Sequence, residues 1–301
     1  MTPPPELVLA AGSTGMTGLL RTRQRVVELS PGTRLGFATD ARRWCLGVTG
    51  DGCPEGAEIT RGRLCPSCEA QDPWRWMHIA HLSDFAPDPR IRKHLMQPHW
   101  LYIATFAGGV SKVGTAVEER KHSRIDEQGA LFAHWVAHAQ DGIEVREWED
   151  QVSQRTFLGQ VVRPATKVTG LASPVDLNLI EARHLLALNA AREVLADILP
   201  QEPVFEPWPS PRPLTALAQH RLRAYPESLG RGRHGFTLLQ CWGPVALVAL
   251  DGDSSPTEHP VDQEQREKPP AWAVDLSALV GHQITFGDFR TEPPAIQEEL
   301  F

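Results

Sequence analysis

Four closely spaced cysteines are the residues in this sequence with the clearest potential chemistry. Cys45, Cys53, Cys65 and Cys68 follow the pattern C-x7-C-x11-C-x2-C. The two residues between Cys65 and Cys68 allow one tight turn to supply two corners of a tetrahedron, and a glycine-containing loop supplies the other pair. Four thiolates leave no open coordination position, which is typical of a structural zinc site. The spacing therefore predicts one structural metal ion, zinc, held by these four residues.

The sequence also allows other roles for these cysteines. They could bind an iron–sulfur cluster, act in redox chemistry or lie together by coincidence, and His78 or His81 could replace one ligand. The sequence has no recognisable export signal, so a reducing compartment makes two disulfides a weaker interpretation than metal thiolates. Cys241 lies in an apolar stretch, and we expect it to be an ordinary core residue.

Three short motifs in the centre of the chain carry polar residues at a characteristic spacing. They are Trp100-Leu101-Tyr102, Ser111-Lys112-Val113-Gly114-Thr115, and the segment from Ser123 to Ala130 that contains Arg124. Together these motifs resemble the GIY-YIG nuclease superfamily. The cysteine knuckle, the K-V-G triplet and R-x-x-x-Q-G-A are also similar to an uncharacterised prokaryotic domain family that carries this module centrally.

The resemblance implies a metal-dependent phosphodiesterase or endonuclease. Tyr102 would position or deprotonate the attacking water, Arg124 would neutralise the phosphate, and Glu149 would hold Mg²⁺ or Mn²⁺, with Glu144 as the alternative. His122 would be an additional phosphate or proton-transfer group. Lys112 stands where the superfamily's second motif has a tyrosine, which suits phosphate binding but removes one proposed general base.

The elements that must position these residues can be read from the same region. Residues 99–106 predict a buried strand, Gly108-Gly109 a tight turn, and residues 110–115 the returning strand of a hairpin. This hairpin would place Tyr102 and Lys112 on one sheet face, about 5 to 8 Å apart. Residues 117–150 show charged and apolar residues at helical spacing, which predicts successive helices broken at Gly129 and Gly142.

Composition shifts divide the chain into candidate domains of an α+β protein. We predict a zinc-binding β module at residues 15–97, a GIY-YIG-like domain at 98–199, a proline-rich linker at 200–213, and a C-terminal β barrel or sandwich at 214–292. The linker carries six prolines, which favour an extended spacer. The best helix pattern lies just before it, at residues 174–198.

Bulk properties limit the possible partners and compartments. The first residues lack the basic and apolar pattern of a signal peptide, and no apolar run is long enough to cross a membrane, so we expect a cytoplasmic protein. The net charge of −7 disfavours sequence-independent coating of nucleic acid, although a local groove could bind DNA or RNA phosphates. The alternatives are an RNA- or tRNA-binding adaptor that has lost catalysis, and an enzyme for a small phosphorylated or carboxylated metabolite. The sequence does not indicate an oligomeric state.

Overall fold

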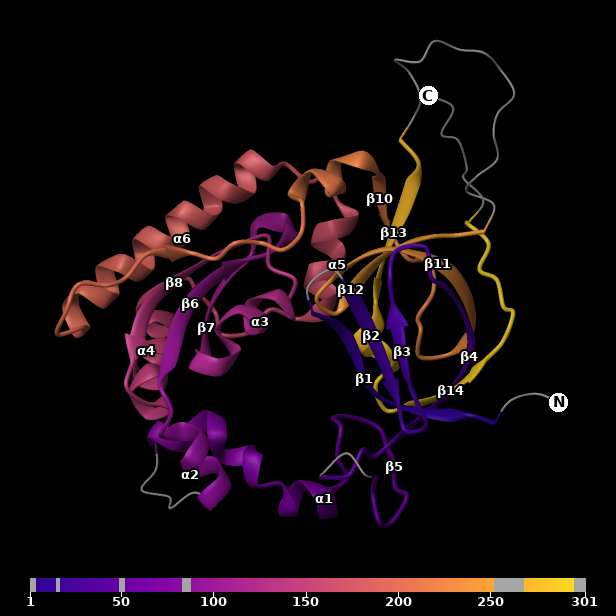
Figure 1. The fold of residues 1–301 in the computed structure, drawn as a ribbon, viewed down its shortest axis with the longest axis horizontal. Coiled ribbons are helices and arrows are strands. Elements are labelled where there is room, and N and C mark those ends of the chain that lie inside the picture. The colour runs from indigo at the N-terminus through magenta and orange to yellow at the C-terminus, as the bar shows by residue number, and fades with distance from the viewer. Residues whose placement is uncertain (1–3, 15–16, 49–51, 83–87, 252–267, 295–301) are drawn as a thin grey trace, which may run out of the picture.

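The computed structural model describes residues 4–14, 17–48, 52–82, 88–251 and 268–294. Within these residues the chain is α+β, which confirms the predicted class. Its strands form two sheets, of four and ten strands. Figure 1 shows the two sheets side by side, with most of the helices around the smaller one.

The larger sheet combines strands from both ends of the chain. Its described order is β10-β13-β12-β11-β4-β14-β1-β2-β3, with β5 paired to β4, and these strands do not close into a barrel. The bounds are β1 (Glu6–Thr14), β2 (Thr17–Thr22), β3 (Val26–Leu29), β4 (Arg34–Trp44), β5 (Glu58–Ile59), β10 (Arg221–Ala224), β11 (Gly232–Trp242), β12 (Val245–Ala249), β13 (Pro270–Asp275) and β14 (His282–Phe286).

The segments predicted as separate N- and C-terminal β modules are thus neighbours in one sheet. Strand β4 lies between β11 and β14, and β1 pairs with β14. One hydrophobic core takes residues from both segments, including Leu20 and Phe37 from the first and Leu238 and Ile284 from the second. Neither segment encloses this core alone.

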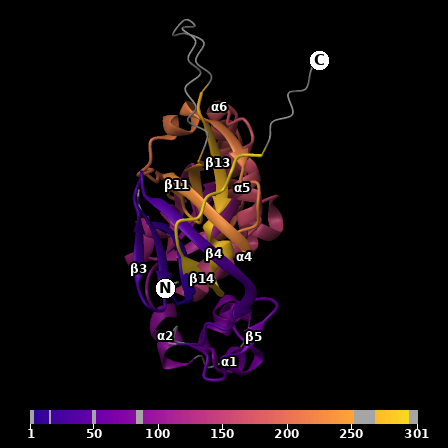
Figure 2. The same cartoon turned by 90° about the vertical axis from the view of Figure 1, so that its right-hand side faces the viewer.

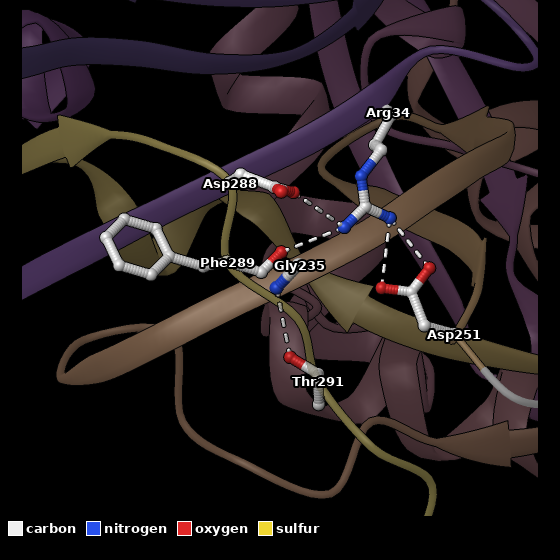
Figure 3. A network of polar contacts seen from close by, with 6 residues as sticks. All are labelled: Arg34, Gly235, Asp251, Asp288, Phe289 and Thr291. Carbon is white, nitrogen blue, oxygen red and sulfur yellow. Dashed lines mark hydrogen bonds and ion pairs between the residues drawn. The ribbon is translucent and has the colours of Figure 1, made fainter.

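The residues after β14 lie across the larger sheet at a point where two glycines face each other. Gly36 of β4 pairs with Gly235 of β11, and a Cβ atom on either would fall within about 2.2 Å of the backbone of residues 287–289. Arg34 holds this segment through hydrogen bonds to Asp288 and the carbonyl of Phe289, and it also hydrogen-bonds to Asp251, which follows β12 (Figure 3). Glycine is therefore required at both positions to let the backbones approach.

The smaller sheet contains the predicted hairpin. Strands β6 (His99–Thr105) and β7 (Ser111–Val117) are antiparallel and joined at η2 (Ala107–Gly109), where both glycines have positive φ. The order is β7-β6-β8-β9, with β8 at Phe132–Ala139 and β9 at Glu206–Pro207, so β7 is an edge strand. The hairpin prediction is confirmed.

The prediction of helices throughout residues 117–150 is wrong for residues 132–139, which form the strand β8. Its apolar residues lie between β6 and β9 in the middle of the sheet, and this pairing overrides the helical spacing of the local sequence. The segment does contain η3 (Glu118–Arg120), α3 (Lys121–Asp126) and α4 (Gly142–Arg155).

Helices cover both faces of the smaller sheet. Helix α4 and the long helix α6 (Leu177–Ile198) pack on the face that carries Leu101 and Ile103, and α6 confirms the strongest helix pattern in the sequence. Helix α3 packs on the face of Tyr102 and Trp135 through Ile125. Helix α5 (Pro164–Ala172) contacts β10 and β13 of the larger sheet. The remaining short helices are η4 (Leu214–Gln219), before β10, and η6 (Leu276–Leu279), between β13 and β14.

A connecting segment joins β5 to β6 along one end of the molecule. It contains α1 (Pro66–Gln71), η1 (Pro73–Leu82) and α2 (Pro89–Leu95). In both ribbon views α1, α2 and β5 lie together at this end (Figures 1 and 2). The later part of this connection, η1 and α2, packs against α4, the helix that carries Glu149.

Candidate functional site

The four cysteines form one compact cluster, as the spacing predicts. Their sulfur atoms all lie within 4.8 Å of one another. The Sγ of Cys53 is 3.7 Å from that of Cys65 and 3.8 Å from that of Cys68. A tetrahedral ion with metal–sulfur bonds of about 2.3 Å separates its sulfurs by about 3.8 Å. The cluster can therefore hold a metal ion, and its dimensions are compatible with zinc.

The backbone of the cluster is arranged for thiolate ligands. The amides of Cys65 and Gly47 point at the Sγ of Cys45, at 3.1 and 3.4 Å. Gly47 has a φ of +76°, and a Cβ there would lie 2.1 Å from the carbonyl oxygen of Gly52. Donors aimed at sulfur stabilise the charged form that binds metal.

The histidine proposed as an alternative ligand has another partner. The Nε2 of His81 lies 2.7 Å from a carboxylate oxygen of Asp150 on α4. The side chain of His78 lies outside the described part of the structure. Cys241 is fully buried in the core of the larger sheet, as expected.

A second polar site is a cavity of about 540 Å³ along the edge strand β7. Four sequence-predicted residues, Tyr102, Lys112, Arg124 and Glu149, line it together. None of the four cysteines does. The cavity also contains positive side chains that the sequence analysis did not single out, namely Arg120 and Arg146.

Tyr102 has a fixed position at the base of this cavity. It is fully buried, it pairs across the hairpin with Gly114, and its hydroxyl accepts a 2.6 Å hydrogen bond from the amide of Gln128. A Cβ at Gly114 would lie 2.5 Å from the hydroxyl oxygen. The glycine of the K-V-G triplet therefore makes room for the tyrosine ring.

A buried lysine supports Gln128 from behind. The Nζ of Lys167 donates a 2.7 Å hydrogen bond to the carbonyl of Gln128 and lies 4.3 Å from the centre of the Phe106 ring. Burial, with repulsion from Lys112 and Arg124, lowers the pKa of Lys167 to about 7. Gln128, which the sequence showed only as part of the R-x-x-x-Q-G-A motif, thus connects Lys167 to Tyr102.

Lys112 lies diagonally across the hairpin from Tyr102, on the same face. Its Nζ is 5.5 Å from the centre of the Tyr102 ring and donates a 3.1 Å hydrogen bond to the carbonyl of Gln160. This separation lies within the range expected from hairpin geometry. Gln160, in the connection between α4 and α5, thus helps to hold the lysine at the cavity wall.

Arg124 reaches the cavity from α3, which a buried ion pair fixes in place. Two residues later on the same helix, Asp126 pairs with Arg212, whose Nε donates a 2.6 Å hydrogen bond to the carbonyl of Cys241. This contact joins α3 to the larger sheet. Among the described residues, no carboxylate lies within ion-pair distance of Arg124, so none of them neutralises its charge.

Glu149 approaches the cavity from α4 beside a second arginine. It is 8% exposed, and its Oε2 is 3.6 Å from a guanidinium nitrogen of Arg146 one helical turn earlier. Burial raises the pKa of Glu149, although Arg146 and Lys112 act in the opposite direction. It is the sole carboxylate among the described residues lining the cavity. A bound cation would favour its ionised form.

Two predicted residues do not line the cavity. Glu144 caps the start of α4 by accepting a hydrogen bond from the backbone amide of Gln140, and His122 is exposed. Arg146 is the residue that helical spacing could have revealed, because it stands three positions before Glu149 on the same face of α4.

The cavity is thus strongly cationic. Lys112, Arg120, Arg124 and Arg146 line it with one carboxylate, and Arg120 also forms an ion pair with Glu127, which does not line the cavity. Such an arrangement attracts an anion, and a tyrosine hydroxyl and a carboxylate stand beside it.

No described helix has the length and apolar character needed to cross a bilayer. No family model, curated protein or solved structure matches the chain.

Proposed function

We propose that the cavity binds a phosphodiester of nucleic acid and processes it as a GIY-YIG-like nuclease. The observation that carries the proposal is that Tyr102, Lys112, Arg124 and Glu149 line one cavity although they come from four different elements. Arg124, which lacks a carboxylate partner among the described residues, is the group best suited to a phosphate. Its charge would stabilise the additional negative charge of the transition state.

In this proposal each side chain has a separate task. The hydroxyl of Tyr102 accepts its hydrogen bond from Gln128, so its own O–H remains available to donate a hydrogen bond that positions a phosphate oxygen or the attacking water. Lys112 and Arg146 add positive charge around the scissile group. Lys112 replaces the tyrosine expected in the second motif and contributes charge rather than a second hydroxyl.

Glu149 would hold a divalent ion, Mg²⁺ or Mn²⁺, which acts as a Lewis acid on the phosphodiester when bound. A single carboxylate fits this role because Mg²⁺ commonly takes one or two protein carboxylates, with waters and substrate phosphates as its other ligands. Glu144 does not fit, since it caps the first turn of α4.

We further propose that Cys45, Cys53, Cys65 and Cys68 hold a structural zinc ion and that the protein works in the reducing cytoplasm. The cluster lies outside the cavity, and the segment that follows it packs on α4. Zinc would therefore stabilise one wall of the site without entering the chemistry.

A catalytically inactive nucleic-acid-binding protein is the second candidate. The replacement of a tyrosine by Lys112 and the excess of cations over carboxylates favour binding over cleavage. The two candidates share the same cavity and the same phosphate, and they differ in whether the strand is cut.

The test uses fluorescently labelled DNA and RNA, single-stranded and duplex, with Mg²⁺ or Mn²⁺. We expect Arg124→Ala to weaken binding at least tenfold and to lower the slope of log affinity against log salt by about one. Arg155→Ala is the matched control, because Arg155 is an exposed arginine on α4 that pairs with Asp197 and does not line the cavity.

Cleavage separates the two candidates. If the protein is a nuclease, Glu149→Gln abolishes cleavage and keeps binding, whereas a binding protein leaves every strand intact at all metal concentrations. Arg124→Ala should change the free energy of unfolding by less than about 0.5 kcal/mol. Equal binding by the Arg124 and Arg155 variants would show that the cavity does not take the phosphate.

A further inference from the structure

An aromatic side chain lies in the wall of this cationic cavity. Trp74, at the start of η1, lines the cavity and keeps 40% of its surface exposed. Met77 of η1 and Val161, which is 78% exposed, line the same cavity. Large apolar side chains are expensive to leave in water, and here they line the same cavity as four cationic side chains, two of which have carboxylate partners.

The indole is held in place rather than mobile on a loop. The carboxylate of Asp72 accepts a 3.0 Å hydrogen bond from the backbone amide of Trp74, and the ring makes an edge contact with His94 at 5.5 Å between centroids. At the other end of η1, His81 is bonded to Asp150 of α4. A fixed ring loses little entropy when a flat partner stacks on it.

We propose that Trp74 is a stacking platform for an unpaired nucleobase, and that the cavity therefore selects single-stranded or locally unpaired nucleic acid. The inference rests on the proposed function, since it assumes that a phosphodiester occupies the cationic part of the cavity. Aromatic rings next to cations that follow the backbone are the general means by which proteins bind single strands. A base inside a duplex is stacked on both faces and cannot reach the indole.

The experiment compares three probes of equal length by fluorescence polarisation: a single-stranded oligonucleotide, the same strand with abasic residues throughout, and a duplex. The abasic strand carries the phosphates without the bases. We expect the wild type to bind the base-bearing single strand at least fivefold more tightly than either of the others. DNA and RNA versions of the probe show whether the sugar matters.

Substitutions then assign the preference to Trp74. We expect Trp74→Ala and Trp74→Leu to lose roughly 5- to 100-fold in affinity for the single strand, and Trp74→Phe to keep most of it, because Phe retains a ring face. Affinity for the abasic strand should change less than twofold in all three. Phe157→Ala is the control, since Phe157 is 69% exposed and does not line the cavity.

The outcomes separate a failure of the proposed phosphate site from a failure of base stacking on Trp74. If the wild type binds no probe, the abasic strand included, the proposed function fails. If it binds the abasic strand and the single strand equally, or if Trp74→Leu and Trp74→Phe behave alike, the phosphate site stands and the stacking inference is wrong. The comparison of Leu with Phe remains decisive even if the alanine variant does not fold.

Discussion

Replacement of Gly114 by alanine should displace the tyrosine at the base of the cavity. The new Cβ would lie 2.5 Å from the hydroxyl oxygen of Tyr102 and 2.6 Å from its Cζ. The ring is fully buried and cannot move aside without displacing its neighbours. Overpacking a tight core costs about 1 to 3 kcal/mol, and loss of the hydrogen bond from Gln128 adds about 1 kcal/mol. We expect a destabilisation of about 2 to 4 kcal/mol.

The assay is equilibrium unfolding in urea, with the free energy of unfolding compared between variants. Gly159→Ala is the matched control, because a Cβ at that glycine meets only one atom, at an ordinary 3.9 Å. It should change stability by less than about 1 kcal/mol. In a Tyr102→Ala background, the cost of Gly114→Ala should fall sharply, since the clashing ring is gone. Equal costs for the two glycine variants, or an unchanged cost in that background, would refute the reasoning.

Two further predictions concern the metal cluster and a buried histidine. Freshly purified protein should contain about one equivalent of zinc by elemental analysis, and Cys65→Ala should abolish it and unfold its segment, because metal binding contributes on the order of 10 kcal/mol in small structural sites; absence of metal with four reactive thiols would contradict this. Burial lowers the pKa of His184 to about 4, so its neutral form stabilises the fold above pH 6.5, and about 3 kcal/mol should be lost as the pH falls from 6.5 through 4. His184→Gln should remove most of that loss in urea unfolding measured at pH 7.5 and pH 4; an identical pH dependence in the variant would contradict the assignment.

The sequence predicts features that depend on local patterns. The hairpin follows from an apolar run, a glycine pair and a second run, and the cysteine cluster follows from its spacing. Placing Tyr102 and Lys112 on one face needs only the alternation of side chains along paired strands. These parts require no knowledge of distant contacts.

Features that depend on distant contacts could not be read in this way. Residues 132–139 are a strand because β6 and β9 flank them, and their own spacing resembles a helix. Trp74 lines the cavity because η1 packs against α4, and no local sequence pattern predicts that packing. Arg146 could be predicted in part: its three-residue spacing from Glu149 places both on one face of the helix, but the sequence does not show that this face lines the cavity.

The pairing of β4 with β11 also has a consequence for how the chain reaches its folded state. In that pairing Phe37 of β4 lies opposite His234 of β11, and Ser13 of β1 hydrogen-bonds to the carbonyl of Gly243, 230 residues away along the chain. During synthesis, β4 would emerge long before its partner, while the hairpin and its helices contain mostly near neighbours and could form first. Until β11 is synthesised, the backbone groups of β4 that will pair with it are unpaired and can pair with another chain, which favours aggregation. An order of folding in which the middle of the chain precedes both of its ends is therefore expected.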